Sequence, residues 1–311
     1  MSSGCSKCGK NAIYLRRYTA ERLCKVCLTQ TTIDRVRKTI NRQKMFRDED
    51  RIVVAISGGK DSAVLLDVLH QIEKNYPRSE LIPLTIDEGI HGYRDEALKA
   101  ARDLTKSLDM KLEVRRFDDL FNYPLDEIVN IRGDGKVLGA CSYCGVLRRR
   151  VLNTAAKELG ADVVATGHNM DDEAQTIIMN MMRGDSIRIA RTNRSRERPV
   201  KGFVPRVKPV LELSERDIVA YAHHRSIPYH DVPCPYSVEA YRNDIRDFLN
   251  AMEHKRPGTL TAILRSGESV SQAFVETSPS FEFGECSVCG EPTPAKVCKV
   301  CQLLDEIKEK E

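Results

Sequence analysis

The stretch Ile52-Val-Val-Ala-Ile-Ser-Gly-Gly-Lys-Asp-Ser62 places a glycine turn directly after a short β-branched run. Such runs, bounded by glycine or polar residues, are typical of buried strands in a parallel sheet. A helix-like stretch at residues 62–74 follows at once. Consecutive N–H groups in a turn between strand and helix, together with the positive end of the helix, form a cradle for an anion. We therefore predict a phosphate-binding loop with Ser57, Asp61 and Ser62 in register.

The surrounding chain predicts the fold class. Further strand-like runs cover residues 81–86, 111–117, 162–166 and, more weakly, 206–210. Helix-like stretches cover residues 93–108, 143–159, 171–182, 214–224, 239–255 and 260–264. Because strand and helix patterns alternate at this spacing, we expect a doubly wound parallel α/β sheet. The loop itself is neither a Walker loop nor a dinucleotide fingerprint, since both glycine spacings are absent from it.

Eleven cysteines fall into groups of four, three and four. The first group is Cys5, Cys8, Cys24 and Cys27, and the last is Cys286, Cys289, Cys298 and Cys301. Paired C-x-x-C spacing in a long, charge-rich chain favours metal binding over disulfides. A closed zinc site uses four ligands, so each outer group predicts one structural zinc. The middle group, Cys141, Cys144 and Cys234, is one ligand short and leaves a position open for chemistry.

Cysteine spacing and composition divide the chain of 311 residues into five parts. We expect an N-terminal zinc ribbon at 1–30, a basic helical connector at 31–50 and a catalytic domain at 51–265. A Ser/Gly/Pro/Glu-rich linker at 266–285 then leads to a C-terminal ribbon at 286–311. No run of 18 or more apolar residues and no signal layout is present, so we expect a cytoplasmic protein with no membrane segment.

The net charge of +4 is modest but unevenly spread. Residues 183–208 hold nine Lys or Arg against two acids, and Arg148, Arg149 and Arg150 form a second cluster. The simplest interpretation is a solvated loop and one polar helix face. The alternative is a patch that contacts the phosphates of a folded RNA. Few aromatic residues and no Trp argue against a base-stacking surface of the single-strand-binding kind.

Several motifs resemble one enzyme family. Ser57-Gly-Gly-Lys-Asp-Ser62 resembles the PP-loop of N-type ATP pyrophosphatases, and Gly167-His-Asn-Met-Asp-Asp-Glu-Ala-Gln175 resembles the second motif of their tRNA-thiolating branch. The segment 86–93, the C-x-x-C-G-x-x-R-R-R pattern at 141–150 and Pro233-Cys-Pro235 are similar to the same branch. The chain most resembles the archaeal and eukaryotic cytosolic tRNA 2-thiolation proteins that act on the wobble uridine. Thiolases of the T-loop uridine share the architecture.

The resemblance implies a tRNA uridine 2-sulfurtransferase that adenylates the uracil C2 oxygen with ATP and then transfers sulfur. It implies an ATP site formed by Ala55, Ser57, Gly58, Gly59, Lys60, Asp61, Ser62, Ile86, Gly167 and Asp172. Asp61 and Asp172 are expected to be catalytic, since carboxylates near a triphosphate commonly hold Mg²⁺. Asp171 is expected to be an N-cap or a solvated neighbour.

Three interpretations of Cys141, Cys144 and Cys234 are open. They form a buried structural trio, a relay that carries a persulfide, or a [4Fe–4S] cluster with one iron lacking a protein ligand. The resemblance implies the cluster and makes all three cysteines catalytic. Some relatives carry a catalytic lysine in the run that here holds only arginines, and arginine stays protonated.

The resemblance further implies tRNA as partner, a ubiquitin-like sulfur carrier protein or free sulfide as sulfur donor, and a homodimer. Two rival functions are a PP-loop enzyme acting on a small metabolite and a zinc-ribbon RNA-binding adaptor with a degenerate nucleotide fold. The first would not need two ribbons, and the intact loop argues against the second.

Overall fold

A five-stranded parallel sheet organises the chain, and the predicted doubly wound α/β fold is confirmed. The computed structural model describes residues 4–133, 138–192, 196, 200–239, 241–277 and 283–310. The strand order is β5-β4-β3-β6-β7. The bounds are β3 Arg51–Ala55, β4 Glu80–Asp87, β5 Glu113–Arg116, β6 Val163–Ala165 and β7 Arg206–Val207. All five coincide with predicted strands, although β7 is shorter than expected because the chain turns away after Val207.

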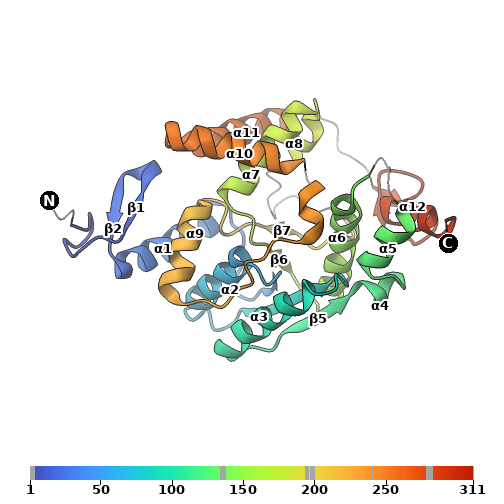
Figure 1. Ribbon diagram of the computed structural model, residues 1–311, viewed down its shortest axis with the longest axis horizontal. Coiled ribbons are helices and arrows are strands. Elements are labelled where there is room, and N and C mark those ends of the chain that lie inside the picture. Colours follow the sequence, from blue (N-terminus) through green and yellow to red (C-terminus); the bar gives the residue numbers. More distant parts are fainter. Residues whose placement is uncertain are drawn as a thin grey trace.

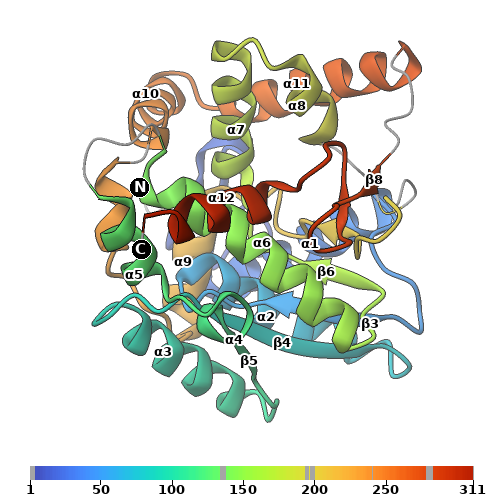
Figure 2. The same cartoon turned by 90° about the vertical axis from the view of Figure 1, so that its right-hand side faces the viewer.

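Helices cover both faces of this sheet (Figures 1 and 2). Side chains alternate along β3, so Ile52 and Val54 pack on one layer and Val53 on the other. The first layer holds α1 Lys25–Arg42, α2 Lys60–Glu73, α3 Arg94–Ser107 and α9 Glu215–Arg225. The second holds α4 Phe117–Phe121, α5 Leu125–Arg132, α6 Ala140–Glu158 and α12 Lys299–Lys308. None of the described helices is both long and apolar enough to cross a membrane.

A separate helical group lies at the top of Figure 1. It consists of α7 Met170–Met182, α8 Ser186–Thr192, α10 Arg242–Lys255 and α11 Thr259–Thr277, while the 3₁₀ helix η2 Pro235–Glu239 leads into α10. Met170, Ile245, Leu249 and Leu260 form its small core.

The predicted linker at 266–285 is wrong over residues 266–277, because these residues belong to α11. Its small residues serve helix packing: a Cβ on Gly267 would lie 2.5 Å from Ile177 Cδ1 of α7. Ser266 and Ser269 donate from their hydroxyls to carbonyls one turn back, at 3.0 and 3.1 Å. A composition that suggests a linker therefore forms a helix because a neighbouring helix covers it. Residues 278–282 lie outside the described part of the chain.

The two cysteine modules lie at opposite ends of the long axis (Figure 1). The N-terminal one contains β1 Tyr14–Arg16, the 3₁₀ helix η1 Arg17–Thr19 and β2 Glu21–Leu23, and the C-terminal one contains β8 Gly284–Glu285 and β9 Pro292–Thr293. The expected boundary between ribbon and connector at residue 30 is wrong, since α1 runs through it. Cys24 is the N-cap of α1, and its sulfur accepts from the Cys27 N–H at 3.5 Å.

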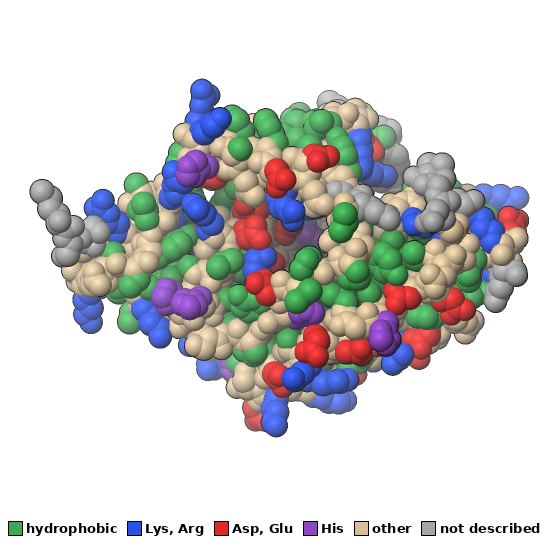
Figure 3. Space-filling model, viewed as in Figure 1, with side chains coloured by type: hydrophobic (Ala, Val, Ile, Leu, Met, Phe, Trp, Pro, Cys, Tyr) green, Lys and Arg blue, Asp and Glu red, His purple; other side chains and the backbone are tan. Residues whose placement is uncertain are grey.

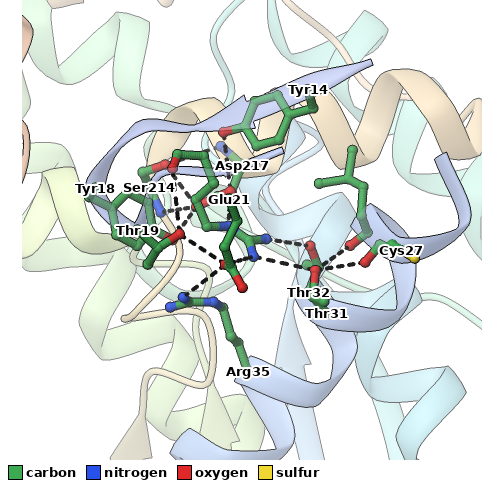
Figure 4. Close-up of polar contacts among 12 residues, drawn as sticks. Tyr14, Tyr18, Thr19, Glu21, Cys27, Thr31, Thr32, Arg35, Ser214 and Asp217 are labelled. Atoms are coloured by element: carbon green, nitrogen blue, oxygen red, sulfur yellow. Dashed lines mark hydrogen bonds and ion pairs between the residues drawn. The ribbon is translucent and has the colours of Figure 1, made fainter. Parts of the chain in front are cut away.

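The N-terminal ribbon is fixed to the catalytic domain by a buried ion pair (Figure 4). Arg16 Nε lies 2.8 Å from Asp217 Oδ1, and both side chains are fully buried. Tyr14 and Tyr18 donate from their hydroxyls to the same carboxylate, at 3.1 and 2.5 Å. Asp217 also forms a capping box with Ser214 at the start of α9. The ribbon therefore rests on the first turn of α9.

Replacing Asp217 with alanine should destabilise the protein strongly, because Arg16 would be left as a buried charge without its main partner. The expected loss in the free energy of unfolding is about 3–5 kcal/mol. Urea denaturation of Asp217→Ala and of Asp34→Ala would check this. Asp34 pairs with Arg37 on the surface, so its loss should cost less than about 1 kcal/mol. Equal losses in the two variants would contradict the role given to the buried pair.

Candidate active site

A cavity of about 860 Å³ opens at the carboxyl ends of β3, β4 and β6. Ligands of doubly wound sheets bind at this edge, where the strand order reverses. Charged side chains of both signs surround a hollow near the middle of the face in Figure 3. The cavity brings together seven of the predicted ATP-site residues: Ala55, Ser57, Asp61, Ser62, Ile86, Gly167 and Asp172.

The turn between β3 and α2 is held closed by its own hydroxyls. Ser62 Oγ accepts from the Ser57 N–H at 3.1 Å and donates to the Gly59 carbonyl at 3.0 Å. Gly58 has φ +89°, and a Cβ there would lie 2.3 Å from the Ala97 carbonyl oxygen. Only glycine fits this position. This geometry at the N-terminus of α2 is compatible with the predicted anion cradle.

Two backbone carbonyls of the turn are bound from outside the cradle. The Ser57 carbonyl accepts from Arg94 Nη1 at 2.6 Å, and the Gly58 carbonyl accepts from the His230 N–H at 2.8 Å. Gly167 packs against the loop so closely that a Cβ on it would lie 2.9 Å from Ser62 N. These contacts fix the loop against α3, the second motif and the segment that leads to Cys234.

Asp61 and Asp172 lie at the same end of the cavity. Asp61 Oδ1 accepts from Asn169 Nδ2 at 2.7 Å, and Lys60 Nζ lies 3.2 Å from Asp61 Oδ2. Burial raises the pKa of both carboxyls, and the charge of Asp172 further raises the pKa of Asp61. A bound divalent cation would favour the ionised form of both. The pair therefore suits Mg²⁺ held together with a triphosphate.

The prediction that Asp171 is an N-cap or a solvated residue is wrong. The N-cap of α7 is Asn169, and Asp171 is buried. Its Oδ2 accepts from the N–H of Glu215 at 2.8 Å, so it anchors the start of α9 instead. Burial raises the pKa of Asp171 to about 6. Its neighbour His168 lines the cavity, and burial lowers its pKa to about 4, which keeps the ring neutral at pH 7.

The middle cysteines lie near one another, and Cys144 contacts Arg148, which lines this cavity. Cys141 and Cys144 lie in the first turn and a half of α6, and Cys234 lies just before η2. Cys141 Sγ donates to the Tyr236 carbonyl at 3.4 Å. Burial raises the pKa of the Cys144 thiol to about 11, and the nearby Cys234 and Cys141 add to that rise. Thiols from α6 and the η2 segment thus face a shared region, which suits a cluster whose thiolates bind separate irons.

Glu88 joins the cysteines to the glycine loop, a role that the motifs did not predict. Its Oε1 lies 2.7 Å from Arg148 Nε and its Oε2 lies 3.0 Å from Arg94 Nε. Arg148 Nη2 also lies 2.9 Å from Cys144 Sγ. Arg94 in turn binds the Ser57 carbonyl. Two signals were available: Glu88 lies in the family-like segment 86–93, and it directly follows an inner strand at the edge where ligands bind.

The outer cysteines form two compact sites. Among the described residues, these quartets are the groups whose ligand atoms all lie within 4.8 Å of one another. Four such sulfurs suit one tetrahedral ion. Arg150 reaches the second quartet, with Nη2 3.3 Å from Cys298 Sγ. The C-terminal ribbon is therefore held against α6.

The basic run at 183–208 is only partly a free surface. Lys208 pairs with Glu173 at 2.6 Å, and Arg196 pairs with Asp50. Arg194 and Arg198 lie outside the described residues. Arg149 and Arg206, by contrast, line the cavity.

Known proteins similar to this chain share its layout. A family model described as a PP-loop domain matches residues 28–253. The tRNA 2-thiolation protein NcsA of Haloferax volcanii is 35% identical over 98% of this chain and 99% of its own length. Cytoplasmic tRNA 2-thiolation protein 1 of Drosophila sechellia is 38% identical over 96% of this chain and 86% of its own. The U34-tRNA thiolase NcsA from Methanococcus maripaludis, solved with its [4Fe–4S] cluster, is 33% identical, with a TM-score of 0.84 over 98% of this chain and 97% of that one.

Gly58→Ala should abolish ATP binding, because the new Cβ would collide with the Ala97 carbonyl and displace the cradle. Gly92→Ala is the matched control: Gly92 has φ +73°, but a Cβ there would meet no atom within 4 Å. It should cost only the left-handed backbone strain, about 1 kcal/mol of stability. Calorimetric titration with ATP would compare them, and similar affinities would contradict the close-approach argument.

Asp171→Asn should stabilise the protein above pH 6. A carboxyl whose folded pKa is raised from 3.8 to about 6 costs stability once it ionises, by up to about 2–3 kcal/mol. The asparagine oxygen can still accept from the Glu215 N–H. We expect the gain over wild type to be largest at pH 7–8 and to vanish near pH 4, as measured by urea unfolding. Asp103→Asn, on the exposed face of α3, removes the same charge and serves as the control for the substitution. A pH-independent difference for Asp171→Asn would contradict the assignment.

Proposed function

The chain belongs to the PP-loop family of tRNA 2-thiolation proteins, and we propose that it converts the wobble uridine of tRNA to 2-thiouridine with ATP and a sulfur donor. One observation carries this proposal: contacts through Arg94, Glu88 and Arg148 join the phosphate loop to Cys144 of the open cysteine set. An enzyme that activates a carbonyl and then sulfurates it needs both groups within reach of one substrate atom.

In the first step the uracil C2 oxygen attacks the α-phosphorus of ATP and pyrophosphate leaves. The N–H groups at the N-terminus of α2, and those of the loop that are not bound within the turn, stabilise the charge on the departing phosphates. Asp61 and Asp172 would hold Mg²⁺, and Lys60, held by Glu215 at 2.7 Å, adds a positive charge beside them. The uridine is then an adenylate with a good leaving group on C2.

In the second step a sulfur nucleophile attacks C2 and AMP leaves. Cys141, Cys144 and Cys234 would hold a [4Fe–4S] cluster, which when bound offers one iron without a protein ligand as a place for hydrosulfide. The alternative is a persulfide on one of these cysteines: its outer sulfur attacks C2, and a second cysteine thiolate then attacks the inner sulfur, which breaks the S–S bond and leaves a cysteine disulfide for an external dithiol to reduce. In either case Arg148 lies next to Cys144 and supplies positive charge for an anionic sulfur and the departing AMP. It stays protonated and so does not accept the proton.

The partners follow from the same relatives. Their names specify tRNA, the cytoplasm and position 34, which favours the wobble uridine over the T-loop uridine. We propose one structural zinc in each outer quartet, a ubiquitin-like carrier or free sulfide as donor, and a homodimer. The zinc would order each ribbon, since such sites contribute folding free energy.

An anaerobic reconstitution tests the function. Purified protein with ATP, Mg²⁺, sulfide and unmodified tRNA should release pyrophosphate only when tRNA is present and should form 2-thiouridine at position 34. Cys234→Ala should retain pyrophosphate release but lose thiouridine and iron, while both zinc ions stay bound. Asp172→Asn should lose both reactions by a factor of about 100 or more, because the metal loses a ligand.

Other outcomes would point elsewhere. Pyrophosphate release without tRNA would favour a small-molecule enzyme, and no release at all would favour the RNA-binding adaptor. Full thiolation by an iron-free anaerobic preparation that receives a persulfide donor in place of sulfide would remove the cluster and favour the persulfide.

A further inference from the structure

The charges that line the cavity do not balance. Each carboxylate there already has a cation: Glu88 has Arg94 and Arg148, Asp61 has Lys60, and Asp172 has Arg242 at 3.5 Å. Lys208 is paired with Glu173. Within the described part of the chain, this leaves Arg149 and Arg206 with no hydrogen bond or ion pair to either guanidinium.

These two arginines form one positive wall. Arg149 comes from α6 and Arg206 from the start of β7. Loss of solvent within the cavity lowers the pKa of both, and the charge of Arg149 lowers the pKa of Arg206 further. Two cations that repel each other in a concave, partly dehydrated site lack a counter-charge, and a bound anion would supply it. Arginine pairs of this kind suit phosphate, which they can bind with two parallel hydrogen bonds.

The same end of the cavity has an aromatic side. Phe203 and Phe283 line it, with ring centroids 6.0 Å apart in an edge-to-face arrangement. Asn153 of α6 holds this segment: its Nδ2 donates to the Gly202 carbonyl at 3.3 Å and its Oδ1 accepts from the Val204 N–H at 3.0 Å. Phe203 is therefore set in place next to the arginines.

The C-terminal ribbon helps to build this wall. Phe283 directly precedes β8, and a Cβ on Gly202 would lie 2.2 Å from Pro292 Cγ of β9. Arg150, adjacent to Arg149, contacts the sulfurs of Cys289 and Cys298. The second cysteine quartet thus shapes the cavity as well as stabilising its own module.

Resting on the proposed function, we propose that Arg149, Arg206 and Phe203 form the subsite for the target nucleotide of the RNA. The arginines bind a backbone phosphate next to the target, and Phe203 supports the splayed-out base. The phosphates of ATP are assigned to the glycine loop and Lys60. The second cationic site in the same cavity is therefore free for a second polyanion, the RNA. Unpaired RNA bases are commonly read by stacking on aromatic rings in this way.

RNA binding and nucleotide binding can be measured separately. We would titrate a fluorescent stem-loop RNA carrying the target uridine at several salt concentrations, and α,β-methylene-ATP by calorimetry. The Arg149→Gln/Arg206→Gln double variant should bind the RNA at least tenfold more weakly, with a salt slope smaller by about 1 if the pair shares one phosphate. Its affinity for the ATP analogue should stay within twofold of wild type, which also shows that the variant is folded.

Arg102→Gln is the charge control, since Arg102 lies on the exposed side of α3. If the double variant binds the RNA as tightly as Arg102→Gln does, the proposed subsite is wrong. An equal or larger loss of ATP-analogue affinity would overturn it too, because the phosphate would then belong to ATP.

The role of Phe203 in supporting the target base is tested with Phe203→Leu, which keeps an apolar side chain but removes the ring. Its affinity for the uridine RNA should fall by about fivefold or more, while a stem-loop that is abasic at the target should bind as it does to wild type. Equal losses for both RNAs would remove the base-stacking role. All these titrations omit sulfide and therefore measure binding alone. A protein that binds RNA through this site, yet forms no 2-thiouridine in the anaerobic reconstitution, would refute the proposed function and leave the subsite intact.

Discussion

The carbonyl oxygens of Ser57 and Gly58 tie the two halves of the site together. Arg94 binds the first, and through Glu88 and Arg148 this contact continues to Cys144. The His230 N–H binds the second, four residues before Cys234. Arg94 is only 3% exposed, and a charge-assisted hydrogen bond such as the one from its Nη1 to the Ser57 carbonyl contributes about 1.5–3 kcal/mol. The loop that binds ATP therefore cannot shift without moving the segments that carry the cysteines.

The first turn of α9 makes a second connection, from the N-terminal ribbon to the same loop. Asp217 in this turn binds Arg16 of the ribbon, while Glu215 binds Lys60 through its side chain and Asp171 through its N–H. These contacts join residues from the ribbon, the glycine loop and the second motif within one helical turn. The ribbon therefore supports the nucleotide site in addition to holding its own cysteine quartet.

Local patterns predicted the parts of this protein that depend on neighbours in sequence. The strands, the glycine loop and the two cysteine quartets are of this kind, since periodicity, turn chemistry and ligand spacing lie within a few residues. The rest depends on contacts between distant segments. The role of Glu88 depends on its ion pairs with Arg94 and Arg148. The role of Asp171 depends on its contact with Glu215. Helix α11 forms because α7 covers its small residues. The run of Arg148, Arg149 and Arg150 shows this most clearly, because three identical residues face Glu88, the open cavity and the C-terminal ribbon.

The central claim is that ATP activates the uracil oxygen before sulfur arrives. A stem-loop or tRNA carrying ¹⁸O at C2 of the target uridine tests it directly, because the attacking oxygen should leave with the α-phosphorus. Mass spectrometry should find one ¹⁸O in AMP for each 2-thiouridine formed and none in pyrophosphate. Formation of 2-thiouridine with unlabelled AMP would contradict adenylation of the carbonyl and, with it, the mechanism assigned to this cavity.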